Sequence, residues 1–279
     1  MGEVTGIAWC DSTFNPWVGC SKVGPGCDNC YAEARMDHRY GKVKWGPGNE
    51  RKRTKTWGDP RKWERQAEQF FAEHGRRRRV FCASLADVFD NEVPDEWRID
   101  LFALIRDTPS LDWLLLTKRI GNVAKMLPAD WGNGYSNVWL GITVVNQEES
   151  DRDIPKLLKI YARIRWLSME PILGEVDITR WLYGPDTPCK ECPLDSDCEC
   201  GWEFRRDIPD NIAPGSIDFC VVGGESGSNH REFNPDWARS LRDQCKAAGV
   251  AFFFKQMSGT SQRSMPPIPD DLMVKEFPK

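Results

Sequence analysis

The sequence predicts one α/β domain over residues 1–279, built as a full or partial (β/α) barrel of the TIM type. Short apolar runs alternate with helix-like stretches along the chain. Within a run, polar and apolar residues hardly alternate, which is typical of parallel strands buried on both faces. The length of 279 residues also fits one such barrel. A doubly wound open sheet is the alternative architecture.

Seven apolar runs are expected to be strands. Each has four to six residues that are rich in Val, Ile, Leu, Phe, Trp or Cys. In chain order the runs are Gly6–Cys10, Arg79–Ser84, Trp113–Thr117, Val138–Thr143, Ile164–Met169, Phe219–Val222 and Val250–Phe254.

Helices are expected between these runs, as βαβ units require. The clearest candidates are Pro60–Glu73, Asp95–Arg106, Ser150–Ala162 and Pro235–Ala248. Ile99, Phe102 and Ile105 form an apolar stripe at helical spacing. Asn234 before Pro235 is a typical helix start.

Composition and charge narrow the class of protein. Hydrophobic residues make up 40% and charged residues 29%, and the net charge is −4, so no global basic field attracts nucleic acid. No apolar stretch is long enough to span a bilayer, and the first residues do not resemble a signal peptide. We therefore expect a cytoplasmic protein without a membrane partner.

The first cysteine group is the strongest functional signal. Cys20, Cys27 and Cys30 have the spacing C-x6-C-x2-C. Three thiolates can hold three irons of a [4Fe–4S] cluster and leave the fourth iron open to a chelating substrate. The group follows the first expected strand, which places it at the mouth of a barrel where active sites lie. The alternatives are a structural zinc site with His38 as the fourth ligand, or cysteines without a metal.

Four motifs add a resemblance to this interpretation. They are NPWVGC at 15–20, GCDNCYAE at 26–33, LSMEP at 167–171 and VVGGESG at 221–227. In this order they resemble the phage and bacterial three-Cys-motif proteins, a radical SAM-like family similar in outline to spore photoproduct lyase. Radical SAM proteins usually have the spacing C-x3-C-x2-C, so the first interval here is three residues longer.

The resemblance implies a mechanism and partners. The [4Fe–4S] cluster would reductively cleave S-adenosylmethionine, with an electron from a flavodoxin- or ferredoxin-type donor, and yield a 5′-deoxyadenosyl radical. The substrate is not implied. A modified or damaged nucleic-acid base or a nucleotide is one candidate, and DNA modification in a phage would be the setting.

Polar residues follow successive expected strands, at the edge where a barrel enzyme binds its cofactor. Asp87 is a candidate for the amine of S-adenosylmethionine, as is Glu225 in a Gly-Gly-Glu element. Lys118 has the alternative of a solvated charge at a helix start, and Thr143 that of a helix cap. The full expected cofactor-binding set is Ser84, Asp87, Lys118, Thr143, Glu170, Gly223, Gly224 and Glu225.

A second cysteine group lies in a long insertion at 183–214. Its four cysteines, with the spacing C-x2-C-x5-C-x-C, are Cys189, Cys192, Cys198 and Cys200. Four thiolates can close a zinc site or hold an auxiliary iron–sulfur cluster. Unligated or redox-active cysteines are the alternative.

Two basic segments bear on nucleic acid. Arg76–Arg79 is a run of four arginines, interpreted as a solvated turn at a helix end, and Gly41–Gly58 mixes basic residues with tryptophan, as single-strand binding surfaces do. The function classes are therefore a radical SAM enzyme, a metal-stapled nucleic-acid-binding module without catalysis, and an iron–sulfur redox protein that does not use S-adenosylmethionine.

Overall fold

The structure is a computed structural model that describes residues 3–182, 216–261 and 263–279. The chain forms two compact units, Met1–Thr143 and Val144–Lys279. The expected insertion at 183–214, with all four cysteines of the second group, lies outside the described residues.

The first unit is built on four parallel strands. In space their order is β1 (Ser12–Thr13), β4 (Arg78–Cys82), β5 (Leu111–Thr117) and β6 (Val138–Thr143). β6 is buried along its whole length, as expected for a strand covered on both faces. A separate antiparallel pair is formed by β2 (Trp17–Val18) and β3 (Lys52–Arg53).

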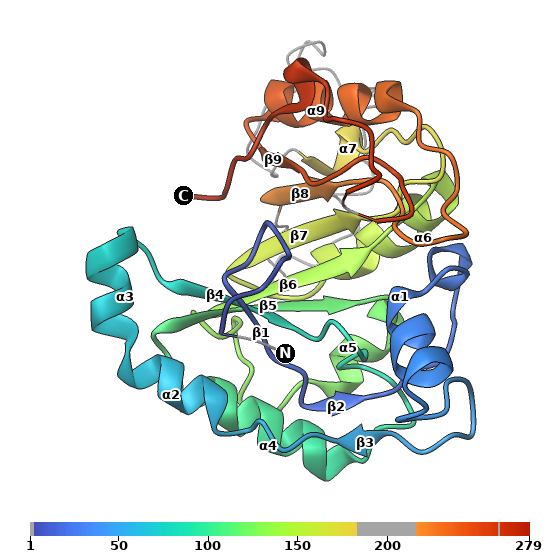
Figure 1. The fold of residues 1–279 in the computed structure, drawn as a ribbon. Coiled ribbons are helices and arrows are strands. Elements are labelled where there is room, and N and C mark those ends of the chain that lie inside the picture. Colours follow the sequence, from blue (N-terminus) through green and yellow to red (C-terminus); the bar gives the residue numbers. More distant parts are fainter. Residues whose placement is uncertain (1–2, 183–215, 262) are drawn as a thin grey trace. The chain divides into compact units, whose positions relative to one another are not determined.

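The helices of this unit connect the strands (Figure 1). They are α1 (Tyr31–Glu33), which continues as a π-helical turn over Ala34–Arg39, α2 (Asp59–Arg65), α3 (Ala67–His74), α4 (Asp95–Arg106) and α5 (Ile120–Met126). The helix expected over Pro60–Glu73 is thus two helices, broken at Gln66. No Gly or Pro marks this break in the sequence. The break lets both Trp63 and Phe70 be buried.

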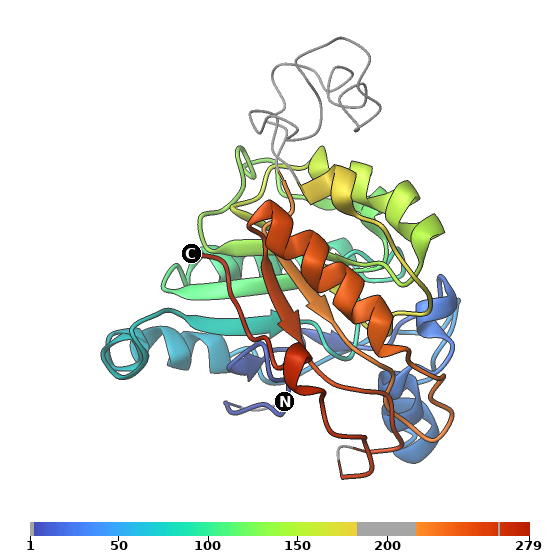
Figure 2. The same ribbon diagram turned by 90° about the horizontal axis from the view of Figure 1, so that it is seen from above.

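The second unit contains three parallel strands, β7 (Ile164–Met169), β8 (Phe219–Val222) and β9 (Ala251–Phe254). Its helices are α6 (Gln147–Leu158), α7 (Thr179–Leu182) and α9 (Pro235–Ala248), with a 3-10 turn at Asp270–Leu272. α9 packs against α7 and β9, and Figure 2 shows it lying along the strand. Asn234 caps its first turn by accepting from the Asp236 amide, as expected.

The parallel strands and their connecting helices confirm the α/β class. Six of the seven expected strands are found within a few residues of their expected bounds, and the seventh is shifted. Seven parallel strands among the described residues are enough for the predicted partial barrel, and one domain over 1–279 stays a prediction.

The first strand was expected in the wrong place. The apolar run Gly6–Cys10 forms a turn, in which the Cys10 amide donates to the Ile7 carbonyl. The polar stretch after it pairs with β4 instead, because the Asp11 carboxylate accepts from the Arg79 amide while the Asp11 amide donates to the Arg79 carbonyl. Tertiary partners thus outweigh the local apolar pattern.

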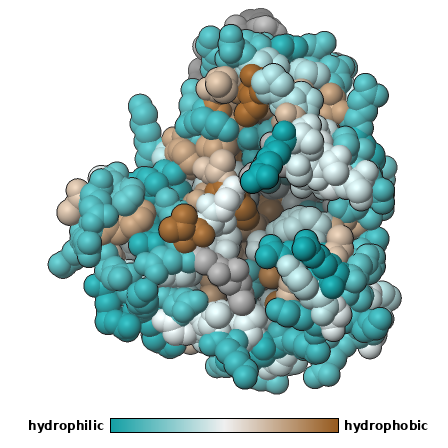
Figure 3. All heavy atoms as spheres, viewed as in Figure 1, coloured by the Kyte–Doolittle hydropathy of each residue, from teal (hydrophilic) through white to brown (hydrophobic). Residues whose placement is uncertain are grey.

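The surface has no large apolar element. The face drawn in Figure 3 is mainly hydrophilic. Ile99, expected on the buried stripe of α4, is 66% exposed, whereas Phe102 and Ile105 are buried as expected. Among the described residues, none of the helices has the length and the hydropathy that a membrane crossing requires.

Candidate functional site

The three cysteines of the first group lie on successive short elements of the first unit. Cys20 follows β2, Cys27 ends a 3-10 turn, and Cys30 occupies the N-cap of α1. The loop is closed by Lys22, whose ammonium bonds to the Asp28 carbonyl at 3.2 Å and pairs with Glu33 at 3.0 Å. All three thiols are free of disulfides.

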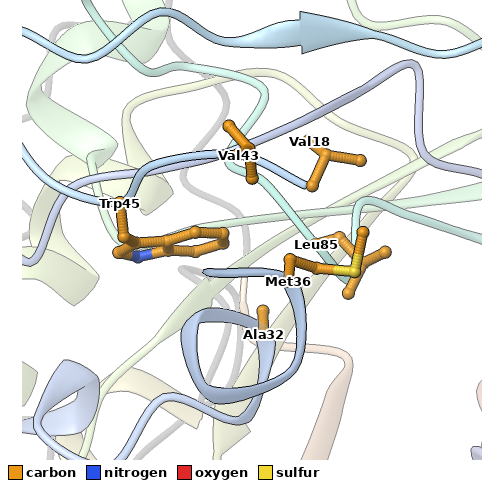
Figure 4. Packing of buried hydrophobic residues seen from close by; sticks show 6 residues of the cluster. All are labelled: Val18, Ala32, Met36, Val43, Trp45 and Leu85. Carbon is orange, nitrogen blue, oxygen red and sulfur yellow. The ribbon is translucent and has the colours of Figure 1, made fainter. Parts of the chain in front are cut away.

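Two of the thiols pack against one small hydrophobic cluster. Cys20 and Cys30 contact it from the side of the loop, and its members come from β2, the α1 region, the following loop and the segment after β4. Figure 4 shows the cluster, which consists of Val18, Ala32, Met36, Val43, Trp45 and Leu85. Cys27 is itself buried. The loop is therefore anchored in the apolar interior of the unit.

The donor set matches an iron–sulfur cluster in kind, since it consists of three free thiols in one glycine-containing loop. It is not a preassembled metal site: within the described part of the chain, no three His, Cys, Asp or Glu side chains form a group that could hold a metal ion. His38, the alternative fourth zinc ligand, is exposed and belongs to no such group. Binding would therefore require the loop to draw its thiols together.

Two cations face the thiols. The Arg119 guanidinium donates from Nη1 to the Cys20 Sγ at 3.4 Å. Burial raises the pKa of the Cys20 thiol to about 12, and the nearby Asp87 carboxylate adds to the rise, whereas Arg119 opposes it. Burial likewise raises the pKa of Cys30, and the charge of Lys118 acts against that rise. The thiols are thus protonated at neutral pH, with positive charges beside them that favour thiolates.

Two of the expected cofactor-binding residues lie together beside this loop. The Lys118 ammonium, just after β5, donates to the Thr143 hydroxyl at the end of β6, at 2.9 Å. Neighbouring parallel strands end at the same edge of the sheet, and this is why the two side chains meet. Thr143 does not cap a helix here. α6 begins instead at Asn146, whose side chain accepts from the Glu149 amide.

Asp87 and Ser84 have partners within the unit. The Asp87 carboxylate accepts from Thr117 Oγ1 at 2.7 Å and from the Lys118 amide at 3.0 Å, and pairs with Arg119 at 3.1 Å. The Ser84 hydroxyl bonds to the Asn15 side chain at 3.0 Å. In this arrangement Asp87 holds the turn between β5 and α5, so its carboxylate is already engaged.

The remaining expected residues lie at the strand ends of the second unit. Glu170, after β7, pairs with the Lys255 ammonium after β9 at 2.9 Å. A Cβ at Gly223 would lie 3.3 Å from the Glu170 Oε1, and one at Gly224 would lie 2.3 Å from the Ser258 amide nitrogen. The two glycines thus allow the strand ends to pack closely around this ion pair.

Glu225 completes the Gly-Gly-Glu element. Its carboxylate accepts from the Arg231 amide at 2.8 Å and from Nη2 of the same guanidinium at 2.7 Å, and the residue is 6% exposed. Like Asp87, this carboxylate is held by an arginine of its own unit.

The four-arginine run is not a solvated turn. Arg76 makes a two-pronged pair with Asp11 at 2.6 and 2.8 Å, and the Arg78 guanidinium lies 4.4 Å from the Phe70 ring centroid. Burial lowers the pKa of Arg79 to about 10. These arginines join β1, α3 and β4, so the run serves the fold of the unit.

The basic segment Gly41–Gly58 has two different roles. Arg51 is 1% exposed and pairs with Asp90 at 2.8 Å, while it donates to the Ser21 hydroxyl at 2.7 Å. Lys52 and Lys55 are exposed. The sequence gave no sign that Arg51 and Asp90 would brace the cysteine loop, because their partners lie far along the chain.

Comparisons with known proteins add the following. A solved structure of a spore photoproduct lyase, carrying a cysteine-to-serine substitution, has a TM-score of 0.44 at 11% identity, covering 89% of this chain and 77% of that one. A search of curated protein sequences gave no match. The resemblance to phage three-Cys-motif proteins stays a prediction. The model of a family described as "Protein of unknown function (DUF5131)" matches residues 4–274. The chain therefore belongs to this DUF5131 family.

Proposed function

We propose that this chain is an iron–sulfur enzyme of the radical SAM type, with Cys20, Cys27 and Cys30 as the ligands of a [4Fe–4S] cluster. The observation that supports the proposal most strongly is the pairing of the thiols with cations: Arg119 donates to Cys20, and the charge of Lys118 acts on Cys30. A cation beside a buried cysteine favours the thiolate, the form that binds metal. When bound, such a cluster supplies the electron that cleaves S-adenosylmethionine.

The chain's own residues have three tasks in this proposal. The cysteines lose their protons and hold the iron, and Lys118 and Arg119 compensate the charge of the thiolates. The hydrophobic cluster around Trp45 keeps water from one side of the loop. Three ligands rather than four leave one iron open for S-adenosylmethionine, which distinguishes this class from plain electron carriers.

Lys118 and Thr143 are the proposed contacts to S-adenosylmethionine in the first unit. The Lys118 ammonium forms no ion pair among the described residues, and its hydrogen bond goes to the Thr143 hydroxyl. It therefore fits the carboxylate of the methionyl group. Asp87 and Glu225 fit the amine less well, because arginines already hold both carboxylates. Glu170, Gly223 and Gly224 remain proposed contacts in the second unit, and Ser84 in the first.

The test is anaerobic reconstitution with iron and sulfide, followed by reduction in the presence of S-adenosylmethionine. We expect about four irons per chain in the first cysteine group and release of 5′-deoxyadenosine. Serine variants of Cys20, Cys27 and Cys30 should lose the iron and the product. The matched control is Cys82→Ala, a buried cysteine in β4 that should leave both unchanged. Zinc as the sole bound metal, with unfolded cysteine variants, would disprove the proposal.

A second candidate, the metal-stapled nucleic-acid-binding module, is favoured by one surface feature. Three cations surround the exposed Tyr40 ring, with Arg39, Lys42 and Arg35 at 5.4, 5.5 and 6.0 Å from its centroid. Within the described part of the chain these three cations form no ion pair. We call Arg35, Arg39, Tyr40 and Lys42 the Tyr40 patch. Cations around an exposed aromatic ring suit a single-stranded nucleic acid, as a substrate or as a bound partner.

Fluorescence anisotropy with a labelled single-stranded oligonucleotide tests the Tyr40 patch. Replacing Arg39 and Lys42 with Glu should weaken binding and flatten its salt dependence by a slope of about 2. Replacing the exposed Arg65 and Lys125 with Glu changes the net charge equally and should leave the salt slope near that of the wild type. Nucleic-acid binding without 5′-deoxyadenosine release would favour the module, and equal binding by both double variants would exclude the patch.

A further inference from the structure

Arg119 makes a contact that the fold of the loop alone does not require. Its side chain is 8% exposed, and its two terminal nitrogens point at the same short segment. Nη2 donates to the Ser21 carbonyl at 2.8 Å, and Nη1 donates to the Cys20 Sγ at 3.4 Å. The first bond anchors the backbone of the loop. The second ends on the sulfur of an expected ligand.

The guanidinium is held in place by its own carboxylates. Asp87 pairs with Nη1 at 3.1 Å, and Asp90 lies 3.9 Å from Nη2. Asp87 is fixed in turn by the Thr117 hydroxyl and by the Phe89 amide, at 2.7 and 2.9 Å. Because every member of this network is buried and bonded, Arg119 cannot swing away from the sulfur without leaving a buried charge unpaired.

A second buried arginine anchors the same segment without touching the sulfur. Arg51 donates to the Ser21 hydroxyl at 2.7 Å and pairs with Asp90 at 2.8 Å and with Glu92 at 2.7 Å. The loop would therefore keep an anchor if the Arg119 contact were lost. The chain thus offers a separation between holding the loop, which both arginines do, and acting on Cys20, which Arg119 does.

We propose that Arg119 is a positioning residue that raises the reduction potential of the cluster through its hydrogen bond and charge at the Cys20 sulfur. This inference rests on the proposed function. Reduction adds one negative charge to the cluster, supplied by a low-potential donor, and a fixed cation with an N–H directed at a ligand sulfur stabilises that added charge. Without Arg119 the cluster would still form on three thiolates, but it would be harder to reduce.

Three variants of the full-length reconstituted protein separate the two roles. Arg119→Gln removes the charge, Arg119→Lys keeps the charge but loses the two-pronged geometry, and Ser21→Ala removes the anchor to Arg51 without touching the sulfur. The measurement is a redox titration followed by electron paramagnetic resonance, with iron content determined on the same samples.

We expect the potential to become more negative in Arg119→Gln, to shift less in Arg119→Lys, and to stay at the wild-type value in Ser21→Ala. A wild-type potential in an iron-replete Arg119→Gln protein would overturn the inference and leave the proposed function standing. Loss of the cluster from both Arg119 variants would also overturn it, because Arg119 would then be a structural anchor. A wild-type protein that takes up no cluster at all would refute the proposed function first, which the iron content shows before any potential is measured.

Discussion

At the scale of single residues, buried arginines organise this chain. Arg51, Arg98 and Arg165 are 1%, 3% and 6% exposed. Burying a guanidinium is unfavourable unless its donors are bonded, and Arg98 meets this need through the Val88 and Asp90 carbonyls. No local pattern reveals such pairs, since Arg51 finds Asp90 39 positions away.

The candidate site was predictable to the same limited extent. Cysteine spacing identified Cys20, Cys27 and Cys30, and the strand ends identified Lys118 and Thr143, because both signals are local. The bond from Arg119 to Cys20 joins positions 99 apart. Only the fold brings them together, so the sequence showed that Arg119 was polar and near a strand end, but not what it contacts.

Asp11 provides a prediction at this scale. Burial would raise the pKa of its carboxyl, but hydrogen bonds from Arg76 and from the Arg79 amide outweigh that effect and hold the pKa below its usual value. The stabilisation is therefore present above the unfolded-state pKa of about 3.9 and is lost as the pH falls through the folded-state value. Asp11→Asn should lower the free energy of unfolding by about 1–3 kcal/mol at pH 7.

Denaturant unfolding at several pH values checks this expectation. The difference between the wild type and Asp11→Asn should shrink as the pH is lowered below about 4. The control is Asp130→Asn, which alters an exposed pair with Arg106 and should change stability by less than about 1 kcal/mol. A pH-independent difference for Asp11→Asn would mean that its ionisation does not matter.

At the scale of elements, the sequence predicted best where the signal was complete within one segment. The bounds of α4 and α9 and of β6, β7 and β8 agree with expectation. Caps and buried runs mark these elements locally. β1 was misplaced because its polar side chains are satisfied by β4, and β2, β3 and α5 were not anticipated, because each is short and depends on its neighbours.

The start of α6 gives a prediction for an element. The Asn146 side chain accepts from the Glu149 amide at 2.9 Å, and the Glu149 carboxylate accepts from the Val145 amide at 3.1 Å, so each residue satisfies a backbone donor at the helix start. Asn146→Ala should cost about 0.5–2 kcal/mol of stability. Combined with Glu149→Ala, the loss should be smaller than the sum of the two single losses.

Thermal unfolding of the two single variants and the double variant measures this coupling. Glu148→Ala, at an exposed position of the same turn, is the control and should have little effect. Strictly additive losses would show that the two caps act independently.

At the scale of the whole chain, the cysteine inventory divides by location. Eleven cysteines are present, and the seven in the described part of the chain are free thiols. The α/β class followed from the alternation of strands and helices, and in each unit the spatial order of the parallel strands follows the chain. Closure of a barrel depends on long-range geometry that a local pattern does not encode.

Metal loading should stabilise the whole chain, because ligands that bind the folded form shift the unfolding equilibrium. At a free metal level about 100 times the dissociation constant, the gain is about 2.7 kcal/mol, which corresponds to a rise in Tm of roughly 5–10 °C for a chain of this size. Removing the metal with a chelator under anaerobic conditions should reverse the rise.

Two serine variants assign this rise to one cysteine group. The variant lacking Cys20, Cys27 and Cys30 should lose the part that depends on iron. The variant lacking Cys189, Cys192, Cys198 and Cys200 reports on the second expected site, zinc or auxiliary iron–sulfur. An unchanged Tm response in the first variant would contradict metal binding at the first group.

The network around Ser21 also has a consequence for inheritance. Arg51, Asp90, Asp87 and Arg119 form two buried pairs that meet at one serine, so a single change that neutralises one partner strands the charge of the other. Such a change should be tolerated in descendants only when the partner position changes with it. In an alignment of this family, positions 51 and 90 should therefore covary, and so should positions 87 and 119, more strongly than exposed pairs such as 106 and 130.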